Sequence, residues 1–478
     1  MALFRIQSIQ NHAMRVEEYI VTDTIWLPDF AQTDGPKYRA IEVAIRQAVR
    51  GGTLKCGDKL PPVRELAWQA KVTPGTVARA YKNLVDAGFL DAAVGRGTFV
   101  PEQKVVQFEE VTDMGATLLS PRLPDLGQTD LIRDGFHRYA DTAASEVLLR
   151  YPVRQNHRDA HLAFYNASKD FPIGKFSPDN VVITHGGQHS IVMILQTVLK
   201  GSSPVVMVDE LTYAGFRRAA ELCRAPTVSV EWDEEGPRLD KFERLVIDHG
   251  VQVYATCSDV INPTAMTTSL KRRQEIAELC RRYGVHIIDD DSYRNGPFIG
   301  PSYRQYVPEL AWYTTSPSKS ISAALRIGFV VPAEGHLNAF IRSVTFNSFG
   351  VPTAITSVYA YVQNHPELPA ILKSTRAHMA DRMRMALNVL GGYKVRWQEN
   401  VPFIWLELPD GWRSGEFCRS SEAQGIFLKS AEEFGPRDGR RVQAVRIALN
   451  GGIAIERFET ALRGLRDLLD HPPERITV

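Results

Sequence analysis

A lysine with serines before it and an arginine after it is the part of this sequence best suited to covalent chemistry. Residues 314–320 read Thr-Thr-Ser-Pro-Ser-Lys-Ser, and Arg326 follows Lys319 just before an apolar run. An amine is the side chain that forms an imine with an aldehyde, and hydroxyls with a guanidinium supply donors for a dianionic phosphate. Taken alone, the stretch is equally typical of a solvated lysine in a serine-rich loop, so other segments must decide.

Strand-like and helix-like stretches alternate from about residue 130 to the end of the chain. Apolar runs precede helical stretches three times: 181–184 before 188–200, 205–208 before 213–224, and 251–254 before 270–283. This alternation predicts an α/β fold with a mainly parallel sheet covered by helices. Ligands of such sheets bind at the carboxyl ends of the strands.

Residues that could hold a ligand do follow those strands. His185-Gly186-Gly187-Gln188 opens a helix directly after a strand, where backbone amides and the helix N-terminus favour a phosphate. Asn262 lies beyond another strand, and three acids, Asp289-Asp290-Asp291, end a third. A metal site is the alternative interpretation of the acids, but no histidine or further carboxylate at ligand spacing supports it.

The segment from Lys37 to Lys104 is much more basic than the rest of the chain. It holds twelve Lys and Arg against six Asp and Glu, so its charge is +6, whereas the whole chain carries +1 and the remainder is therefore −5. A basic module on a mildly acidic body is the expected footprint of DNA binding. A solvated helical bundle with scattered lysines is the alternative.

The same segment predicts three helices and a hairpin. An amphipathic helix ends at Gly51-Gly52, a short second helix follows Pro61-Pro62, and a third begins with Thr73 as N-cap and Pro74 as first residue. Val77, Tyr81, Leu84 and Val85 are expected on the buried stripe of the third helix, with Thr76, Arg79, Lys82 and Asn83 outside. Gly88 can close that helix in a left-handed cap, before a hairpin around 95–97. This order predicts a winged helix-turn-helix.

The sequence of this segment resembles that of the GntR-type regulators over all of residues 37–100. The resemblance rests on Gly-Asp-Lys-Leu-Pro-Pro-x-Arg-Glu-Leu-Ala, Thr-Val-Ala-Arg-Ala-Tyr-x-x-Leu and Gly-x-Gly-Thr-Phe-Val. It implies that Arg64, Thr76, Arg79 and Arg96 face double-stranded DNA. The family usually has Ser-Arg where this chain has Thr73-Pro74, so one basic contact is missing at the entrance of the recognition helix.

The later segments, taken in order, resemble the signature of fold-type I aminotransferases. That resemblance implies pyridoxal 5′-phosphate (PLP) bound as a Schiff base on Lys319, with Asp290 on its ring nitrogen and Arg446 on the carboxylate of a ligand. Asp290 is preferred to its neighbours because of its three-residue spacing to Tyr293. The remaining implied contacts are Gly187, Gln188, Ser316, Ser318 and Arg326 with the phosphate, Tyr213 stacked on the ring, and Asn262 and Tyr293 on the 3-oxygen.

Departures from the aminotransferase pattern occur beside these residues. Ala265 stands where glycine is usual, Leu211 replaces a common proline, and Asn156 replaces the glycine of the segment after Tyr151. None removes a cofactor contact, but they argue more against efficient catalysis than against cofactor binding. Tyr151 itself occupies the place of a tyrosine that reaches the phosphate across a dimer interface.

A winged helix followed by an aminotransferase-like domain resembles the MocR subfamily of GntR-type regulators. The two resemblances imply a winged helix-turn-helix at 37–100 after an extension at 1–36, a linker at 101–112, and at 113–478 an aminotransferase-like domain with a small C-terminal α/β subdomain. The expected function is transcriptional regulation, in which a homodimer senses an amino acid or amine through an external aldimine. The alternative is an active aminotransferase with a secondary DNA-binding domain.

Composition sets the expected compartment. Five scattered cysteines without C-x-x-C spacing argue against a disulfide framework or a zinc site and favour a reducing environment. The first residues lack the apolar run of a signal peptide, and no stretch of the sequence is long and apolar enough to span a bilayer. We therefore expect a cytoplasmic protein without a membrane partner.

Overall fold

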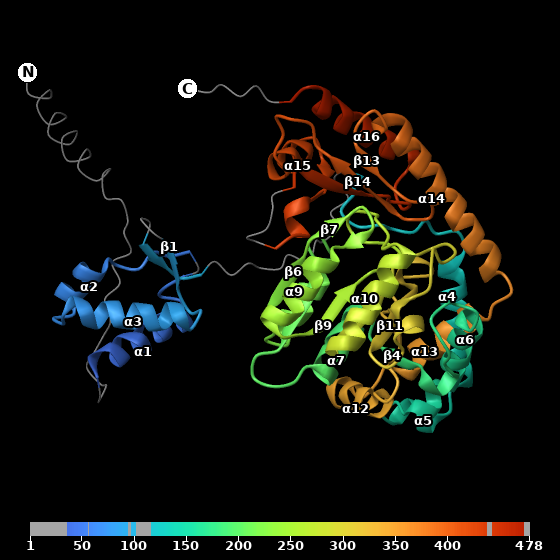
Figure 1. The fold of residues 1–478 in the computed structure, drawn as a ribbon, viewed down its shortest axis with the longest axis horizontal. Helices are drawn as coiled ribbons and strands as arrows, with labels where there is room; N and C mark the ends of the chain where they lie inside the picture. Colours follow the sequence, from blue (N-terminus) through green and yellow to red (C-terminus); the bar gives the residue numbers. More distant parts are fainter. Residues whose placement is uncertain (1–35, 56, 94–96, 102–115, 437–441, 473–478) are drawn as a thin grey trace, which may run out of the picture. The chain divides into compact units, whose positions relative to one another are not determined.

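The computed structural model describes residues 36–55, 57–93, 97–101, 116–436 and 442–472. The chain divides into two compact units, Met1–Val111 and Thr112–Val478, whose elements are labelled in Figure 1. The extension at 1–36, apart from its last residue, and nearly all of the predicted linker lie outside the described residues, as does Arg96.

The small unit contains the predicted three helices and hairpin. Its elements are α1 (Lys37–Arg50), α2 (Val63–Gln69), α3 (Pro74–Asp86), β1 (Asp91–Ala93) and β2 (Gly97–Phe99). The two strands are antiparallel, with Asp91 opposite Phe99. One apolar cluster joins the three helices and the residues flanking the hairpin, so the winged helix-turn-helix has its own core.

Helix α3 begins as predicted, with Thr73 as N-cap and Pro74 in the first turn. The Thr73 hydroxyl lies 2.9 Å from the Thr76 hydroxyl and makes no capping bond to the helix backbone. Gly88 has a φ of +65°, as expected for a left-handed residue after the helix. The buried stripe includes Ala80, whereas Val85, expected on it, is only half-buried.

A seven-stranded sheet forms the centre of the large unit. Its order is β4 (Val182–Thr184), β12 (Gly328–Val331), β11 (Ala311–Thr315), β10 (His286–Asp290), β9 (Val251–Thr256), β5 (Val205–Asp209) and β6 (Thr227–Val230). The five strands from β11 to β6 are parallel to one another. Only β12 runs against its neighbours, so the predicted mainly parallel sheet is confirmed.

Alternation along the central strands explains how both faces of this sheet are covered. In β5, Val206 and Val208 pack with α7 (Gly187–Val198), α8 (Ala214–Leu222) and α12 (Leu337–Ser348). Met207, which lies between them, points to the opposite face and packs with α9 (Leu239–His249) and α10 (Leu270–Tyr283), which Figure 1 shows crossing the sheet. Successive side chains of a strand point to opposite faces, so a strand buried on both sides is apolar throughout.

A smaller antiparallel sheet forms the predicted C-terminal subdomain. Its order is β13 (Val395–Arg396), β14 (Phe403–Glu407), β17 (Ala444–Ala448) and β16 (Lys429–Ser430). Helices α14 (Leu368–Leu390), α15 (Ser414–Ala423) and α16 (Ile455–Asp470) pack on it through one apolar cluster. Beside them, β15 (Ile426–Phe427) pairs in parallel with β3 (Ala116–Thr117) from the beginning of the unit.

The remaining helices complete the large unit. They are α4 (Gln128–Thr142), α5 (Ser145–Leu149), α6 (Arg158–Ser168), α11 (Tyr303–Tyr306) and α13 (Thr353–Gln363). Among the helices that the structure describes, none is both long and apolar enough to cross a membrane.

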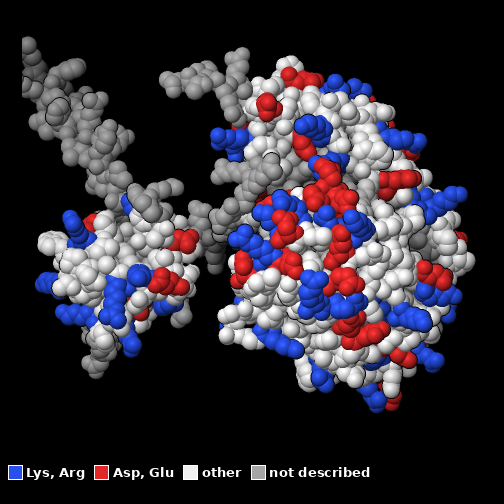
Figure 2. Space-filling view, in the orientation of Figure 1, with Lys and Arg blue, Asp and Glu red and all other residues white. Residues whose placement is uncertain are grey.

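Figure 2 shows how charge is distributed over the visible faces of the two units. On the large unit, acidic side chains lie among basic ones, and many of these form surface ion pairs. On this face, therefore, neither sign of charge forms a separate patch. The basic excess computed from the sequence is instead confined to the segment that contains the small unit.

Candidate functional site

Strand ends bring most of the predicted ligand-binding residues to one edge of the seven-stranded sheet. Asp290 is the last residue of β10, and Lys319 lies in the short turn after the parallel neighbour β11. Gly187 begins α7 just beyond β4, which runs in the same direction as β11 because β12, between them, is antiparallel to both. The three residues therefore meet where ligands of open α/β sheets bind.

The Lys319 side chain is largely enclosed. Its ammonium lies 3.5 Å from the carbonyl oxygen of Pro121 and 5.7 Å from the centre of the Tyr293 ring. Burial, followed by the nearby guanidinium groups of Arg446 and Arg326, lowers the Lys319 pKa to about 8. An amine with this pKa is available as a nucleophile near neutral pH, which an exposed lysine is not.

This depressed pKa predicts how the capture of an aldehyde depends on pH. The charged form of Lys319 must lose a proton before it attacks, so the capture rate should rise with pH up to about 8 and then level off. The measurement is the rate at which PLP added to cofactor-free protein gains the absorbance of the lysine-bound form, followed from pH 6 to 10. A rate that keeps climbing to the pKa of an ordinary lysine, about 10.4, would contradict this environment.

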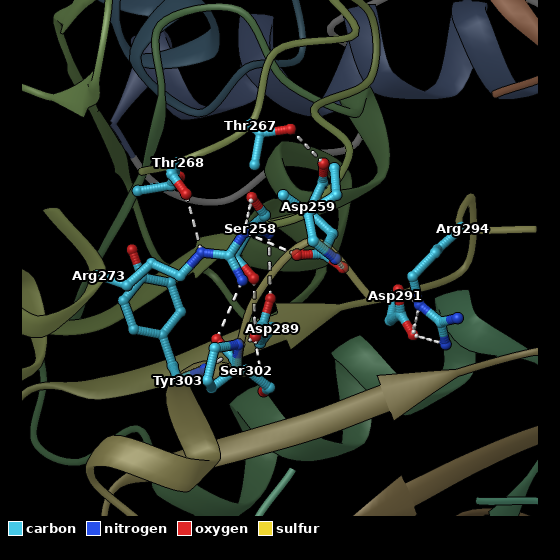
Figure 3. A network of polar contacts seen from close by, with 12 residues as sticks. Ser258, Asp259, Thr267, Thr268, Arg273, Asp289, Asp291, Arg294, Ser302 and Tyr303 are labelled. Atoms are coloured by element: carbon cyan, nitrogen blue, oxygen red, sulfur yellow. Dashed lines mark hydrogen bonds and ion pairs between the residues drawn. The ribbon is translucent and has the colours of Figure 1, made fainter. Parts of the chain in front are cut away.

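Two of the three consecutive acids serve the fold. Asp289 accepts hydrogen bonds from the backbone and hydroxyl of Ser258 and from the hydroxyl of Ser302, at 2.7–3.1 Å. Asp291 accepts hydrogen bonds from two nitrogens of the Arg294 guanidinium, and the shorter of these bonds is 2.6 Å. Figure 3 shows these carboxylates turned toward different partners. In the described part of the chain, no group of three His, Cys, Asp or Glu side chains is arranged to hold a metal ion.

Asp290 differs because its described hydrogen-bond donors are both on Ser292. The hydroxyl of Ser292 donates to it at 2.6 Å and the backbone amide at 3.2 Å. Burial raises the pKa of Asp290 to about 6, against the opposing effect of these bonds. A buried carboxyl with no cationic side chain bonded to it suits a positively charged atom of a ligand, such as a protonated ring nitrogen.

Glycine and arginine form a cradle for an anion at the start of α7. Gly186 has a φ of +88°, and a Cβ there would lie 2.8 Å from the guanidinium of Arg326, so a larger residue would displace that side chain. The hydroxyls of Ser316 and Ser318 are 2.8 Å apart, and Ser316 also donates to the carbonyl of Ile327. Ser318 is therefore the donor in the contact between the two hydroxyls, and its hydrogen can be turned to a phosphate by giving up that contact.

Tyr213 and Gln188 pack around a glycine that sequence reasoning missed. Gln188 donates to the carbonyl of Gly215 at 2.9 Å, and its side-chain oxygen is buried without a partner. A Cβ on Gly215 would lie 2.1 Å from the Tyr213 ring and 2.2 Å from that oxygen. Gly215 therefore fixes where the tyrosine ring lies, and no spacing in the sequence indicated it.

Arg446 and Asn262 form the opposite wall of the site. Arg446 is 3% exposed, donates from one terminal nitrogen to the side-chain oxygen of Asn262 at 2.8 Å, and donates from the other to the carbonyl of Leu119. The amide nitrogen of Asn262 and the Nε of Arg446 are buried without partners. Two unused buried donors on one wall fit a ligand that brings acceptor oxygens.

Tyr151 is not assembled with these residues. Its ring is 73% exposed and stacks on Phe349 at 5.0 Å between centroids. The described contacts of this single chain thus leave Tyr151 on the outside, where a tyrosine that acts across an interface would lie.

A cavity of about 280 Å³ adjoins the lysine turn. Aromatic side chains of α6 and α13 and apolar side chains of α14 line it, and Lys319, Ser292 and Ser316 form part of its wall. The cavity therefore shares these three side chains with the lysine site.

The predicted DNA-facing residues of the small unit are on its surface or half-buried. Arg64 is exposed in the first turn of α2, and Thr76 is half-buried near the start of α3. The guanidinium of Arg79 lies 4.2 Å from the centre of the Tyr38 ring in α1. Sequence reasoning missed this stack because Tyr38 and Arg79 are brought together only by the packing of α1 on α3.

Comparison with known families divides the chain in the same way. Residues 125–442 match the family model described as aminotransferase class I and II. Residues 37–100 match the model described as bacterial regulatory proteins, gntR family.

Individual proteins resemble the chain over most of its length. The uncharacterized HTH-type transcriptional regulator YdeF of Bacillus subtilis is 25% identical over 97% of this chain and 99% of its own. The vitamin B6 salvage pathway transcriptional repressor PtsJ of Salmonella typhimurium is 28% identical over 86% of this chain and 94% of its own. The crystal structure of LysN, an α-aminoadipate aminotransferase of Thermus thermophilus, covers 74% of this chain and 92% of its own with a TM-score of 0.66 at 19% identity, which supports the fold.

Proposed function

This chain belongs to the aminotransferase class I and II family, and from that premise we propose that it is a PLP-dependent transcriptional regulator that senses an amino acid or amine. The observation that carries the proposal is the joining of two parts in one chain. One is a lysine site with a buried carboxylate and anion donors, and the other is a basic winged helix-turn-helix. An ordinary aminotransferase has no use for the second part.

PLP fits the site through the groups that the geometry leaves available. Lys319 would hold its aldehyde carbon, Asp290 its ring nitrogen, and Arg326 with the start of α7 its phosphate. When bound, the cofactor supplies an electrophilic carbon that a primary amine can attack. The protein's own contribution is to lower the pKa of Lys319 so that part of it is deprotonated near neutral pH, to fix the ring against Tyr213, and to present Arg446 to a carboxylate.

A homodimer is part of the proposal. Exposed apolar side chains gather beside Tyr151, and they include Leu148, Leu149, Val153, Phe346 and Phe349. Phe349 stacks on Tyr151, and Gly350 lies near Pro152, so α5 and the end of α12 contribute to the same surface. An apolar surface of this kind marks an interaction site, and a second copy would bring Tyr151 toward the neighbouring phosphate cradle. The proposed setting is the cytoplasm, where double-stranded operator DNA is accessible.

The test of this function uses the purified protein loaded with PLP. Candidate amino acids and amines should change its visible absorbance and also its affinity for a DNA fragment that it retains from genomic DNA. A keto acid should not be needed for either change. Rapid turnover of amine and keto acid, with no effect on DNA affinity, would instead support an aminotransferase.

Arg79 provides a prediction for the DNA-binding half. In winged helices the recognition helix enters the major groove, and an arginine that reads a base contributes roughly 1–3 kcal/mol of discrimination. The stack on Tyr38 holds the Arg79 guanidinium in place before binding. We expect Arg79→Ala to weaken binding to the retained fragment by this amount and binding to a scrambled duplex by much less.

The matched control is Arg46, which stacks on Phe89 at 4.4 Å in the same unit. Arg46→Ala removes the same charge and a similar stack, so it should weaken both duplexes alike. The measurement is a titration of each variant against both duplexes at two salt concentrations. Equal losses on the two duplexes for Arg79→Ala would show that this arginine does not read bases.

A further inference from the structure

We propose that a ligand carboxylate signals by displacing the Leu119 carbonyl from Arg446 and so releasing the segment Ala116–Pro124, here named the strap. The inference rests on the proposed function and adds how the site is coupled to the DNA-binding unit. It also restricts the class of effector. An amine that carries a carboxylate should signal, whereas an amine without one should replace Lys319 on the cofactor aldehyde without signalling.

The strap is held to the C-terminal subdomain along its backbone. Leu118 donates to the carbonyl of Phe427 at 2.9 Å, and its own carbonyl accepts from the Ala448 amide at 2.9 Å. The side chain of Asn450 donates to the Thr117 carbonyl at 2.9 Å. These bonds extend the small subdomain by one short segment, which leads directly into the lysine site.

Two further carbonyls of the strap point at the two cationic side chains that define the site. Leu119 accepts from Arg446, and Pro121 accepts from Lys319 at 3.5 Å. The strap therefore occupies positions that the reacting groups of an amino acid would need. A carboxylate would replace the Leu119 carbonyl, whereas the Pro121 carbonyl accepts from Lys319 only while that amine is not bound to an aldehyde.

Charge favours the exchange at Arg446. The guanidinium is buried, its described acceptors are the neutral oxygens of Asn262 and Leu119, and the Tyr293 hydroxyl, also neutral, is a further hydrogen-bond partner. The bond to Leu119 already has an ionised donor, but a carboxylate adds the opposite charge and can accept from two nitrogens of one guanidinium, whereas Leu119 accepts from one. The unused Nε of Arg446 is available for the second of these bonds. A neutral amine supplies no such competitor for Leu119.

Because of its position in the chain, the strap can pass the replacement of the Leu119 carbonyl on to the DNA-binding unit. Ala116 is the first described residue of the large unit, and the chain N-terminal to it leads to the winged helix, which ends near Val100. A ligand shifts an equilibrium only by its differential interaction with the two states. Here that difference is the Leu119 bond, which exists without the carboxylate and is lost with it.

Three probes with related carbon chains separate the two halves of the argument. L-Norvaline has an amine and a carboxylate, n-butylamine has only the amine, and pentanoate has only the carboxylate. Each is added at millimolar concentration to the PLP-loaded full-length protein. Visible absorbance reports reaction at Lys319, and hydrogen exchange of the peptide that covers 116–124 reports release of the strap.

Absorbance and hydrogen exchange should respond to different pairs of probes. L-Norvaline and n-butylamine should change the absorbance, whereas L-norvaline and pentanoate should raise exchange in the strap several-fold. The strap proposal is overturned if n-butylamine raises exchange as much as L-norvaline does, or if neither carboxylate raises it. Absence of any absorbance change with the two amines would instead overturn amine sensing, while the pentanoate result would still decide the strap.

Variants provide a second decision. Arg446→Gln should show high strap exchange without any probe and no further rise with pentanoate. Arg122→Ala is the matched control, because Arg122 is an exposed arginine of the strap itself, and it should respond like the wild type. If Arg446→Gln kept low exchange and a normal pentanoate response, Arg446 would not hold the strap.

Discussion

Lys319→Ala is expected to abolish covalent capture of PLP while the protein remains folded. The methyl group of alanine cannot form an imine, and Lys319 is the lysine that lies over the Tyr293 ring and close to Arg446. The visible absorbance of the lysine-bound cofactor should disappear. After borohydride treatment, mass spectrometry should find no modified peptide containing residue 319, a loss limited only by the sensitivity of detection.

The matched control is Lys175→Ala, because Lys175 is an exposed lysine of the same unit. It should retain the absorbance and the modified peptide of the wild type. If Lys319→Ala protein still carried reduced PLP on another lysine, with an unchanged spectrum, the assignment of Lys319 would be wrong.

Arg273→Met is expected to lower the free energy of unfolding of the large unit by about 3–5 kcal/mol. The Arg273 side chain is fully buried and donates to the Asp259 carboxylate at 2.7 Å and to the carbonyls of Thr268 and Ser258 at 2.9 Å (Figure 3). Methionine fills similar space but leaves a buried carboxylate without its cation. Denaturant unfolding of the PLP-free protein measures the loss.

Arg281→Met is the control for that experiment. Arg281 pairs with Glu309 at 2.9 Å, but its side chain is 42% exposed, so water replaces the lost contact. Exposed pairs contribute about 0–1 kcal/mol. If the two variants unfolded at the same denaturant concentration, the buried network would not stabilise the fold as argued.

The sequence was sufficient to predict the elements that local patterns determine. Thr73 and Pro74 located the start of α3, and apolar runs located the central strands. Candidate ligand residues were found at strand ends because parallel strands bring those ends to one edge. The resemblance to the family's sequence motifs then assigned roles that the strand pattern left open, such as the preference for Asp290 over its neighbours.

Contacts between distant segments could not be predicted in this way. The bond between Arg446 and Leu119 joins residues far apart in the chain, and the stack of Arg79 on Tyr38 depends on how α1 packs on α3. Gly215 matters only because the Tyr213 ring folds back over it. Such pairs follow from tertiary packing, for which a single sequence has no periodic signal.

We propose that reaction of an amine at the Lys319 site changes the affinity of the same chain for DNA. The most direct measurement is the affinity of wild type and Lys319→Ala, both with PLP present, for the genomic fragment that the wild type retains most tightly. Each titration is run with and without the amino acid that most changes the wild-type absorbance. We predict that this amino acid changes the wild-type affinity roughly 5- to 150-fold, the usual range of allosteric coupling, and changes the Lys319→Ala affinity much less, because without the lysine-bound cofactor the ligand keeps only its carboxylate contact with Arg446. An equal change in both proteins, or no change in the wild type despite the altered absorbance, would contradict the account.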